Sequence, residues 1–320
     1  MSHGISRKYF LQLATGFSGS LLLNRDRIPF FMTPEESLKD TMKKTNIIVR
    51  TIPSSGEKLP VIGMGTWLTF DAGNSDERRK KLKEVLGIFH SNGGKLIDSS
   101  PMYGSAEKVV GDLVADLKNR KDLFLATKVW TNGESNGIEQ MEQSFSKMQT
   151  GTIDLLQVHN LVDARVHLRT LQRWKQEGKI RYIGITHYVV SAYPELMQFI
   201  KNEKPDFVQF NFNIGVREAE NKLLPYCQDN GIAVINNRPF NGGNLFEEVK
   251  GKKLPLWAKD YEIENWAQFF LKYIISHPGV TCAIPATSNP EHMRENMGAA
   301  VGLLPDKAAR EKMVDYFKKI

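Results

Sequence analysis

Apolar strand-like runs alternate with amphipathic helical stretches along most of this 320-residue chain. The strand-like runs are short and almost continuously apolar, as in "IDLLQVH" at 153–159 and "IRYIGIT" at 180–186. Runs of this kind are typical of a parallel sheet that is covered on both faces, because neither face alternates with polar residues. No other feature of the sequence restricts the fold as strongly.

Counted from "VIGMGTW" at 61–67, eight strand–helix units fit into about 275 residues, the size and number of a (β/α)8 TIM barrel. A doubly wound sheet is the alternative, but no GxGxxG follows the first strand, as a dinucleotide-binding Rossmann domain would require. The segment "NIIVRTIPSSGEKLPVIG" before the first strand predicts a β-hairpin that caps the floor of the barrel. The other predicted strands are 95–99, 123–128, 206–211, 231–236 and 281–285, and the predicted helices include 76–91, 105–119, 138–149, 164–176 and 219–229.

Charge and cysteine content exclude several classes of protein. The formal net charge is +7, but lysine and arginine are interleaved with acidic residues and no block of five like charges occurs. This pattern is typical of an ordinary solvated surface, so we expect no nucleic-acid partner. Cys227 and Cys282 lack CxxC spacing and lie in regular segments, which predicts reduced packing residues and no disulfide framework.

The N-terminal residues differ from the rest of the chain. In "SRKYFLQLATGFSGSLLL" (6–23), Arg7 and Lys8 precede an apolar stretch that is too short to span a bilayer as a mature helix. The segment resembles a twin-arginine export leader, which carries a folded protein across the inner membrane. We therefore predict a leader and polar linker over 1–45, a barrel domain over 46–320, no stable membrane insertion of the mature protein, and a periplasmic location reached through the twin-arginine machinery. A frayed extension on a cytoplasmic protein is the alternative.

Ionisable residues end three successive strands of the predicted barrel. Asp98 ends the second strand, Lys128 the third and His159 the fourth, and Tyr103 lies in the loop after Asp98. Each residue alone has a structural explanation, as a helix cap, a surface charge, a hydrogen-bonded core histidine or a packing ring. Because catalytic groups of TIM barrels sit at the carboxyl ends of the strands, we expect all four side chains to face one pocket.

Elementary electrostatics predicts a joint role for these four residues. A lysine ammonium about 4 Å from a phenol, at an effective dielectric near 20, stabilises the phenolate by about 4 kcal/mol, or about three pKa units. This would lower the pKa of Tyr103 and make it a usable general acid, while Asp98 keeps Lys128 charged. His159 could donate a hydrogen bond to the substrate oxygen. The set contains no nucleophile and no metal cluster, so something else must supply the other half of the reaction.

The four residues and their surroundings resemble a known family. Asp98-x4-Tyr103-Gly, Lys128 in "LATKVW" and His159 in "IDLLQVHN" resemble the catalytic tetrad of the aldo-keto reductases. The blocks "IGMGTW", "RYIGITHY", "VQFNFN" and "IPATSNPEHMRENMGAA" follow in the family's order, so that the resemblance covers about residues 47–302. It implies that NADPH, or NADH, gives a hydride to a small-molecule aldehyde or ketone while Tyr103 gives the proton. "NNRPFNGGNLF" and "SHPGVTCAIP" look like a bacterial subgroup whose members often carry twin-arginine leaders.

The resemblance also implies which residues bind the cofactor. Thr186 and His187 occupy the positions that bind the nicotinamide carboxamide, and Asn237 stands where many members stack an aromatic ring. Ala286 and His292 replace a lysine and an arginine that clamp the 2′-phosphate in many members, so the preference for NADPH is expected to be shallow. The other contacts implied by the family are Gly65, Thr66, Gln209, Arg238, Phe240, Thr287, Ser288, Asn289, His292, Glu295 and Asn296.

Two tryptophans and three histidines bear on the substrate and on rival functions. Trp67 and Trp130 follow the first and third strands, where the family lines its substrate pocket, and favour an apolar or aromatic carbonyl. A cofactor-binding sensor or regulatory subunit with little turnover is the main rival function. A metal-dependent hydrolase is disfavoured because three further histidines lie on or beside predicted helices, away from the strand ends. These histidines are His90, His167 and His277.

Overall fold

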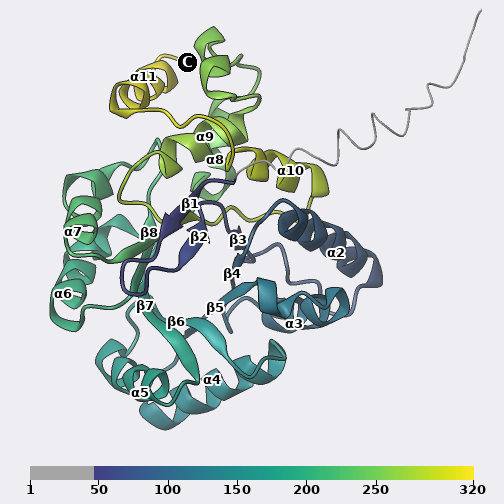
Figure 1. The fold of residues 1–320 in the computed structure, drawn as a ribbon, viewed down its shortest axis with the longest axis vertical. Helices are drawn as coiled ribbons and strands as arrows, with labels where there is room; N and C mark the ends of the chain where they lie inside the picture. The colour runs from purple at the N-terminus through teal and green to yellow at the C-terminus, as the bar shows by residue number, and fades with distance from the viewer. Residues whose placement is uncertain (1–46) are drawn as a thin grey trace, which may run out of the picture. The chain divides into compact units, whose positions relative to one another are not determined.

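Eight parallel strands occupy the centre of the structure, which is a computed structural model that describes residues 47–320 (Figure 1). The leader and polar linker predicted for residues 1–45 lie outside the described residues. Each strand pairs with the next in chain order, from β3 to β10, and every pair is parallel. The strands are β3 Met64–Gly65, β4 Leu96–Asp98, β5 Phe124–Val129, β6 Ile153–His159, β7 Ile180–Thr186, β8 Phe207–Asn211, β9 Ala233–Asn237 and β10 Cys282–Ala283.

The first and last strands meet and close the sheet. Parallel bridges join Ile62 to Ala283 and Gly65 to Ala286, and the amide of Gly63 donates to the carbonyl of Ala283 at 2.8 Å. A side chain at Gly63 would lie within 3.0 Å of Leu96 and Cys282, so only glycine allows this close approach. The predicted (β/α)8 TIM barrel is therefore confirmed.

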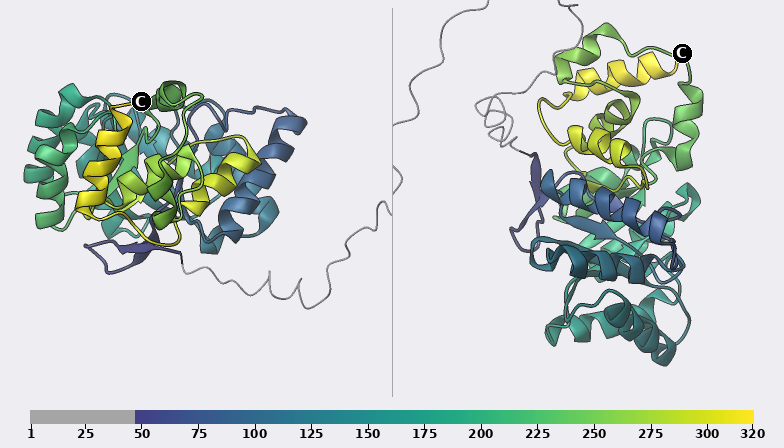
Figure 2. Two further views of the ribbon diagram at one scale, coloured as in Figure 1. Left: turned by 90° about the horizontal axis from the view of Figure 1, so that it is seen from above. Right: turned by 90° about the vertical axis from the view of Figure 1, so that its right-hand side faces the viewer.

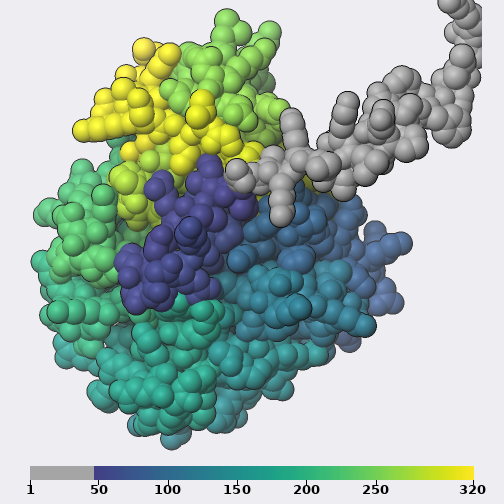
Figure 3. All heavy atoms as spheres, viewed as in Figure 1, coloured from purple at the N-terminus to yellow at the C-terminus, as the bar shows by residue number. Residues whose placement is uncertain are grey.

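A β-hairpin closes one end of the barrel, as the sequence predicted. Its strands are β1 (Val49–Thr51) and β2 (Lys58–Pro60), which pair antiparallel. Ile52 and Leu59 are fully buried and pack with the inward side chains at the amino ends of the barrel strands. In Figures 1 and 3 the hairpin crosses the middle of the face that is turned to the viewer. The floor of the barrel is thus an apolar plug, and any site must open at the other end.

Helices surround the barrel, as the two views of Figure 2 show. The helices predicted at 76–91 and 164–176 have those bounds in the structure. The first begins directly after its N-cap Ser75, with Asp76 and Glu77 in its first turn, and the second has buried residues from Ala164 to Trp174. None of the helices within residues 47–320 is both long enough and apolar enough to cross a membrane. The α-helices are α2 Asp76–Ser91, α3 Ala106–Leu117, α4 Glu134–Lys147, α5 Ala164–Gln176, α6 Tyr193–Glu203, α7 Leu223–Asp229, α8 Asn244–Glu248, α9 Trp266–Ile275, α10 Pro290–Gly298 and α11 Lys307–Phe317.

Three predicted helices have bounds that differ in the structure. The helix predicted at 105–119 is the shorter α3, Ala106–Leu117. The helix predicted from residue 138 begins at Glu134. Its first turn is polar and carries no apolar periodicity, so the hydrophobic pattern could not locate the start. The helix predicted at 219–229 is divided into the 3-10 helix η3 (Glu218–Asn221) and α7, since Lys222 has non-helical dihedral angles. The spacing of hydrophobic residues does not predict a local backbone conformation of this kind.

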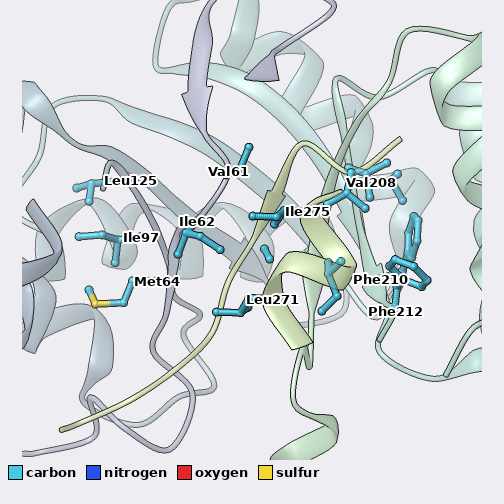
Figure 4. Close-up of a cluster of buried hydrophobic side chains, with 14 of the residues drawn as sticks. Val61, Ile62, Met64, Ile97, Leu125, Val208, Phe210, Phe212, Leu271 and Ile275 are labelled. Atoms are coloured by element: carbon cyan, nitrogen blue, oxygen red, sulfur yellow. The ribbon is translucent and has the colours of Figure 1, made fainter. Parts of the chain in front are cut away.

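The core forms two layers because successive side chains of a strand point to opposite faces. Outward residues such as Ile97, Leu125 and Val208 pack against the helices, and Figure 4 shows them with residues of α9 such as Leu271 and Ile275. Inward residues form a separate cluster inside the barrel. Their members are Leu96, Phe124, Ala126, Leu155, Tyr182, Phe207, Ala233, Ile235, Cys282 and Ile284, together with Ile52 and Leu59 of the hairpin segment.

Candidate active site

The inward positions turn from apolar to polar toward the carboxyl ends of the strands. On β4, Leu96 is followed two residues later by Asp98, and on β6, Leu155 is followed by Gln157 and His159. The period of two along a strand puts all of these side chains inside the barrel. The apolar floor therefore supports a layer of polar groups, and this layer is the candidate active site.

Asp98 and Lys128 form a buried ion pair in this layer. Lys128 Nζ lies 2.6 Å from Asp98 Oδ2 and donates to the Ser99 carbonyl at 2.7 Å. The Lys128 side chain is fully buried and that of Asp98 is 3% exposed. Burial lowers the pKa of Lys128, but the charge of Asp98 and the neighbouring Tyr103 outweigh this effect and raise it above its usual value. Lys128 is therefore a fixed cation inside the barrel.

Tyr103 contacts both this cation and His159. Lys128 Nζ is 4.9 Å from the centroid of the Tyr103 ring, and the Tyr103 and His159 rings meet edge to face, with centroids 5.9 Å apart. The loop that carries Tyr103 is tied down, because Asp71 Oδ1 accepts from the Ser105 amide at 2.9 Å and from its hydroxyl at 2.7 Å. All four predicted residues thus come together at one end of the barrel.

The predicted net lowering of the Tyr103 pKa is wrong. Burial raises the pKa of the phenol, and the opposing charge of Lys128 does not fully offset it, so the pKa lies above its ordinary value of 10.0. The sequence argument included the lysine charge but could not include the desolvation of a phenol enclosed by other side chains. At neutral pH the structure therefore holds a protonated tyrosine beside a cation.

His159 is neutral across the physiological range. Burial, with the charges of Lys128 and His187, lowers its pKa from 6.5 to about 2. The Ser100 hydroxyl lies 3.1 Å from its Nδ1, so the ring is held by a hydrogen bond. An imidazole in this state can donate or accept a hydrogen bond but carries no charge.

We predict that the ring signals of His159 do not titrate between about pH 5 and pH 8 in an NMR experiment. Since the imidazole of the unfolded chain takes up a proton below its ordinary pKa of 6.5, His159 lowers the free energy of unfolding as the pH falls below that value. His159→Gln identifies the signal. A titration midpoint near pH 6.5 would contradict the assigned environment.

Hydroxyl and amide side chains continue the polar layer on β7, β8 and β9. Gln209 Oε1 accepts from Thr186 Oγ1 at 3.2 Å and from Asn237 Nδ2 at 3.3 Å. Gln209 Nε2 donates to Asp98 Oδ1 at 3.0 Å. Asn237 Oδ1 is buried and has no hydrogen-bond partner among the described residues. Three predicted cofactor residues therefore form one network, which includes an acceptor that still lacks a donor.

A cavity of about 520 Å³ opens beside the predicted catalytic residues and the amide network of Gln209. It is lined by three of the predicted catalytic residues, Asp98, Tyr103 and His159, while Lys128 lies beneath its wall. Of the two predicted tryptophans only Trp67 lines it, whereas Trp130 stands beside it, with its ring 6.4 Å from that of His159. The predicted cofactor residues in its wall are Gly65, Thr66, Thr186, Gln209, Asn237, Arg238 and Phe240.

The other predicted cofactor residues lie outside this cavity. His187 follows β7, and its Nδ1 accepts from the Val189 amide at 3.2 Å. Thr287 and Asn289 shape the start of α10, because Thr287 Oγ1 accepts from the Asn289 amide and Asn289 caps the helix. Asn296 is buried within α10. Ser288 and His292 are exposed, and Glu295 is half-buried.

The sequence argument did not identify several residues of the site. Gln157 lies two residues before His159 on β6, is fully buried, and donates to Asp98 Oδ1 at 3.0 Å. The inward period of β6 could have identified it. Tyr188 and Phe246 also line the cavity. They lie outside the strands, where sequence spacing does not indicate where a side chain points.

No group of three or more potential metal ligands (His, Cys, Asp or Glu) comes together within residues 47–320. His90 lies near Asp122 at 3.4 Å, His167 is buried on α5, and His277 follows α9. These histidines therefore lie on or beside helices, away from the polar layer of the barrel.

Known proteins match both the sequence and the fold. The model of the Aldo/keto reductase family matches residues 61–312. Methylglyoxal reductase YeaE of Escherichia coli (strain K12) is 30% identical over 275 residues, which cover 83% of this chain and 94% of that protein. An NADH-specific methylglyoxal reductase of the same organism is 25% identical over 293 residues, covering 74% and 89% of the two chains.

A solved structure agrees with these sequence matches. The aldo/keto reductase of Klebsiella pneumoniae, in complex with NADP and acetate, has a TM-score of 0.68 and 25% sequence identity, and the match covers 82% of this chain and 93% of that one. The family match extends over the whole barrel, from the first strand to α11. The chain therefore belongs to the aldo/keto reductase family of NAD(P)H-dependent oxidoreductases.

Proposed function

We propose that this protein reduces an aldehyde or a ketone to an alcohol, with Tyr103 as the general acid. One observation carries the proposal: a protonated phenol that contacts both a buried lysine cation and a neutral histidine lines a cavity. As hydride reaches the carbonyl carbon, negative charge develops on the oxygen, and a phenol at that point can give its proton. The Lys128 cation then stabilises the phenolate that remains.

The other residues of the site support this role of Tyr103. Asp98 keeps Lys128 charged inside the barrel. If the Ser100 hydroxyl donates to His159 Nδ1, the Nε2–H of His159 is left to hold the carbonyl oxygen of the substrate. A charged imidazole would compete as the acid, but the pKa of about 2 removes that possibility.

The residues of the cavity fit a nicotinamide dinucleotide, which supplies the hydride when it is bound. The unpartnered Asn237 Oδ1, next to Thr186 and Gln209, is suited to the amino group of a carboxamide. Arg238 lines the cavity, and no carboxylate within residues 47–320 lies within ion-pair distance of it. Its guanidinium is suited to a pyrophosphate. NADP in the Klebsiella relative supports the phosphorylated cofactor.

We predict that NADPH is preferred over NADH by less than about a hundredfold in kcat/KM, because no lysine or arginine stands at Ala286 or His292 to clamp the 2′-phosphate. Thr287 and Asn289 are already engaged at the start of α10. Initial rates with each cofactor at a fixed aldehyde concentration measure the ratio. Ala286→Lys should raise the preference for NADPH, with Ala115→Lys, at an exposed position of α3, as the control. A preference of a hundredfold or more for either cofactor in the unmodified protein would contradict this reading.

We further propose that the substrate is a neutral carbonyl compound with an apolar or aromatic body. Trp67, Leu68 and Met102 line the cavity and are 44%, 69% and 41% exposed, so the mouth is apolar. The Asp98 charge in the wall is paired with Lys128, and we assign Arg238 to the cofactor. A carboxylate on the substrate would have no cation of its own. The methylglyoxal reductases among the relatives also support an uncharged carbonyl substrate.

Benzaldehyde should therefore be reduced with a kcat/KM at least about tenfold higher than that of 4-carboxybenzaldehyde. The two compounds have the same ring and aldehyde and differ by one carboxylate group. Equal values, or a preference for the carboxylate, would show that a cation serves the substrate.

The basic test is NADPH oxidation by the purified protein with methylglyoxal and with benzaldehyde. A cofactor-binding sensor or regulatory subunit is the rival function, and it predicts cofactor binding without appreciable oxidation. Turnover with at least one of the two compounds supports the enzyme. Saturable cofactor binding with no turnover for either would favour the sensor.

We also propose that the protein is exported to the periplasm through the twin-arginine machinery. The support is the Arg7-Lys8 pair followed by an apolar stretch, in a segment outside the described residues. Cell fractionation of the full chain, with Arg7→Gln/Lys8→Gln as the comparison, tests this. A cytoplasmic location of both proteins would contradict it.

A further inference from the structure

A second cavity of about 390 Å³ lies in the outer wall of the barrel and shares no lining residue with the active-site cavity. Its walls come from η3, from the end of α9 and from the start of α11. Three cations line it, Arg217, Arg310 and Lys307, against two carboxylates, Glu220 and Glu311. His277 also lines it, and burial keeps this imidazole neutral by lowering its pKa to about 4. The lining therefore has a net positive charge.

The arginines of this cavity are held in place but only partly used. Glu220 pairs with both Arg217 and Arg310, and Arg217 Nε also lies 3.0 Å from the Tyr273 hydroxyl. Arg310 Nε donates to the Tyr273 carbonyl at 3.0 Å, and the Arg310 side chain is 10% exposed. The Nη1 atoms of Arg217 and Arg310 have no hydrogen-bond partner among the described residues. One carboxylate thus orients two guanidinium groups without saturating either.

Lys307 adds a third, unpaired cation. It is the first residue of α11, it is exposed, and no carboxylate within the described part of the chain lies within ion-pair distance of it. A purely structural ion-pair network would need only Arg310 and Glu220 to join α11 to η3. The remaining donors belong to residues that line a cavity of about 390 Å³, which is large enough for a small organic anion.

We propose that this cavity binds a small phosphate monoester, with Arg217, Arg310 and Lys307 as its donors. Arginine forks and a lysine ammonium are the side chains that recognise a phosphate dianion by charge-assisted hydrogen bonds. The site is separate from the carbonyl-reducing site and does not depend on the proposed function.

Calorimetry on the full chain tests this site with two probes, inorganic phosphate and glycerol 3-phosphate, and with glycerol as the uncharged control. The protein is first saturated with NADP⁺, so that the cofactor site is filled. We expect both anions to bind with a dissociation constant at or below about 1 mM, which rises with salt, and glycerol not to bind. Binding that is seen only without NADP⁺, or no binding up to about 10 mM, would overturn the proposal.

Lys307→Gln and Arg217→Gln, both at accessible positions, should each weaken phosphate binding at least about tenfold. Lys318→Gln, an exposed lysine that caps the other end of α11, should leave it within about twofold and serves as the matched control. Thermal unfolding checks that each variant is folded. Equal binding by all three variants would overturn the assignment of the donors.

A different observation, inside the barrel, concerns Gln157. Its Nε2 donates to Asp98 Oδ1 at 3.0 Å, and its Oε1 accepts from Gln209 Nε2 at 3.2 Å. One buried amide therefore connects the catalytic ion pair to the network that faces the cofactor. The neighbouring strand makes room for it, because a Cβ at Gly184 would lie 2.8 Å from Gln157 Cγ.

We infer that Gln157 is a positioning residue for the carbonyl reduction proposed above, on which this inference rests. Asp98 uses Oδ2 for Lys128 and Oδ1 for Gln157 and Gln209, so the two amides fix the plane of the carboxylate. The titratable groups that interact with that carboxylate are Lys128, Tyr103 and the buried Cys282. Gln157 does not line the cavity and acts through Asp98 and Gln209.

Gln157→Leu keeps most of the volume and removes both hydrogen bonds. We expect kcat to fall about tenfold and the dissociation constant of NADPH to rise about threefold, with the aldehyde KM unchanged. Gln157→Glu should lower kcat further, because it puts a second carboxylate against Asp98. Unchanged kcat and NADPH affinity in both variants would overturn the inference. If the wild type itself reduces no carbonyl, the proposed function fails, and NADPH affinity alone then decides the role of Gln157.

A double-mutant cycle separates positioning from general damage. Gly184→Ala alone should lower kcat, because the new methyl group displaces Gln157. In a Gln157→Ala background the closest clash is removed, although Leu155 Cδ1 at 3.2 Å and the Phe207 carbonyl at 3.3 Å remain close, and Gly184→Ala should lower kcat no further. Additive losses of kcat in the double variant would show that the two residues act independently and would contradict the inference.

Discussion

Replacing Lys128 by methionine should destabilise the fold and abolish most of the turnover. The side chain is fully buried and pairs with Asp98 at 2.6 Å, so its loss leaves a carboxylate inside the barrel without a cation. Breaking a buried pair in this way costs about 3–5 kcal/mol of the free energy of unfolding. The rate of carbonyl reduction should fall at least about a hundredfold, since no cation then stabilises the Tyr103 phenolate. Chemical denaturation and steady-state kinetics measure the two effects.

A second change separates stability from catalysis at this position. Asp98→Asn/Lys128→Met removes both charges and should recover much of the lost stability, because no unpaired carboxylate remains. It should not recover turnover. Lys121→Met, at an exposed position, controls for the loss of one lysine charge. If Lys128→Met were as stable and as active as the wild type, the ion pair would have neither role.

Tyr103→Phe should lower kcat for carbonyl reduction by about a hundredfold to ten-thousandfold. The change removes one hydroxyl and keeps the ring, so the edge-to-face contact with His159 and the packing should survive. The affinity for NADPH should stay within about twofold, since the phenol is assigned to the substrate oxygen. Rates with a saturating aldehyde and a fluorescence titration with NADPH measure the two quantities.

Tyr261→Phe is the matched control for this change, since Tyr261 does not line the active-site cavity. It should leave kcat unchanged. The same experiment separates the enzyme from a cofactor-binding sensor. If Tyr103→Phe turned over as fast as the wild type, Tyr103 would not be the general acid.

The barrel could be predicted from the sequence because its signals are local. Each strand is a short apolar run, the helix at 164–176 carries an apolar stripe along its whole length, and the helix at 76–91 carries one from Leu82 to Phe89. The hairpin could be predicted because the segment that contains Ile52 and Leu59 precedes the first barrel strand. This segment is too short to form a further strand–helix unit. The start of α4 and the break at Lys222 depend on backbone dihedral angles, which hydrophobic spacing does not report.

The candidate catalytic residues could be located because strand ends converge in a closed barrel. Asp98, Lys128 and His159 end or nearly end three neighbouring strands, and the parallel register puts them beside one another. The side chain of Gln157 also points into the barrel, but Gln157 lies two residues before the end of β6. A polar residue inside a strand is not marked as a strand end by the sequence pattern. Tyr188 and Phe246 reach the cavity from loops and a short helix, whose paths the sequence pattern does not fix.

The electrostatic state of the site could be predicted only in part. The pairing of Lys128 with Asp98 follows from two opposite charges at adjacent strand ends. The raised pKa of Tyr103 and the very low pKa of His159 follow mainly from burial, which depends on the loops that enclose both rings. Desolvation is a property of the folded surroundings and has no counterpart in residue spacing.

The most direct test of the central claim is a structure of the protein with NADP⁺ and a bound carbonyl compound. If Tyr103 is the general acid, its hydroxyl lies about 2.6–3.2 Å from the carbonyl oxygen, with Lys128 on the far side of the phenol. A carbonyl oxygen beyond hydrogen-bond reach of Tyr103, and in contact with a different proton donor, would contradict the mechanism.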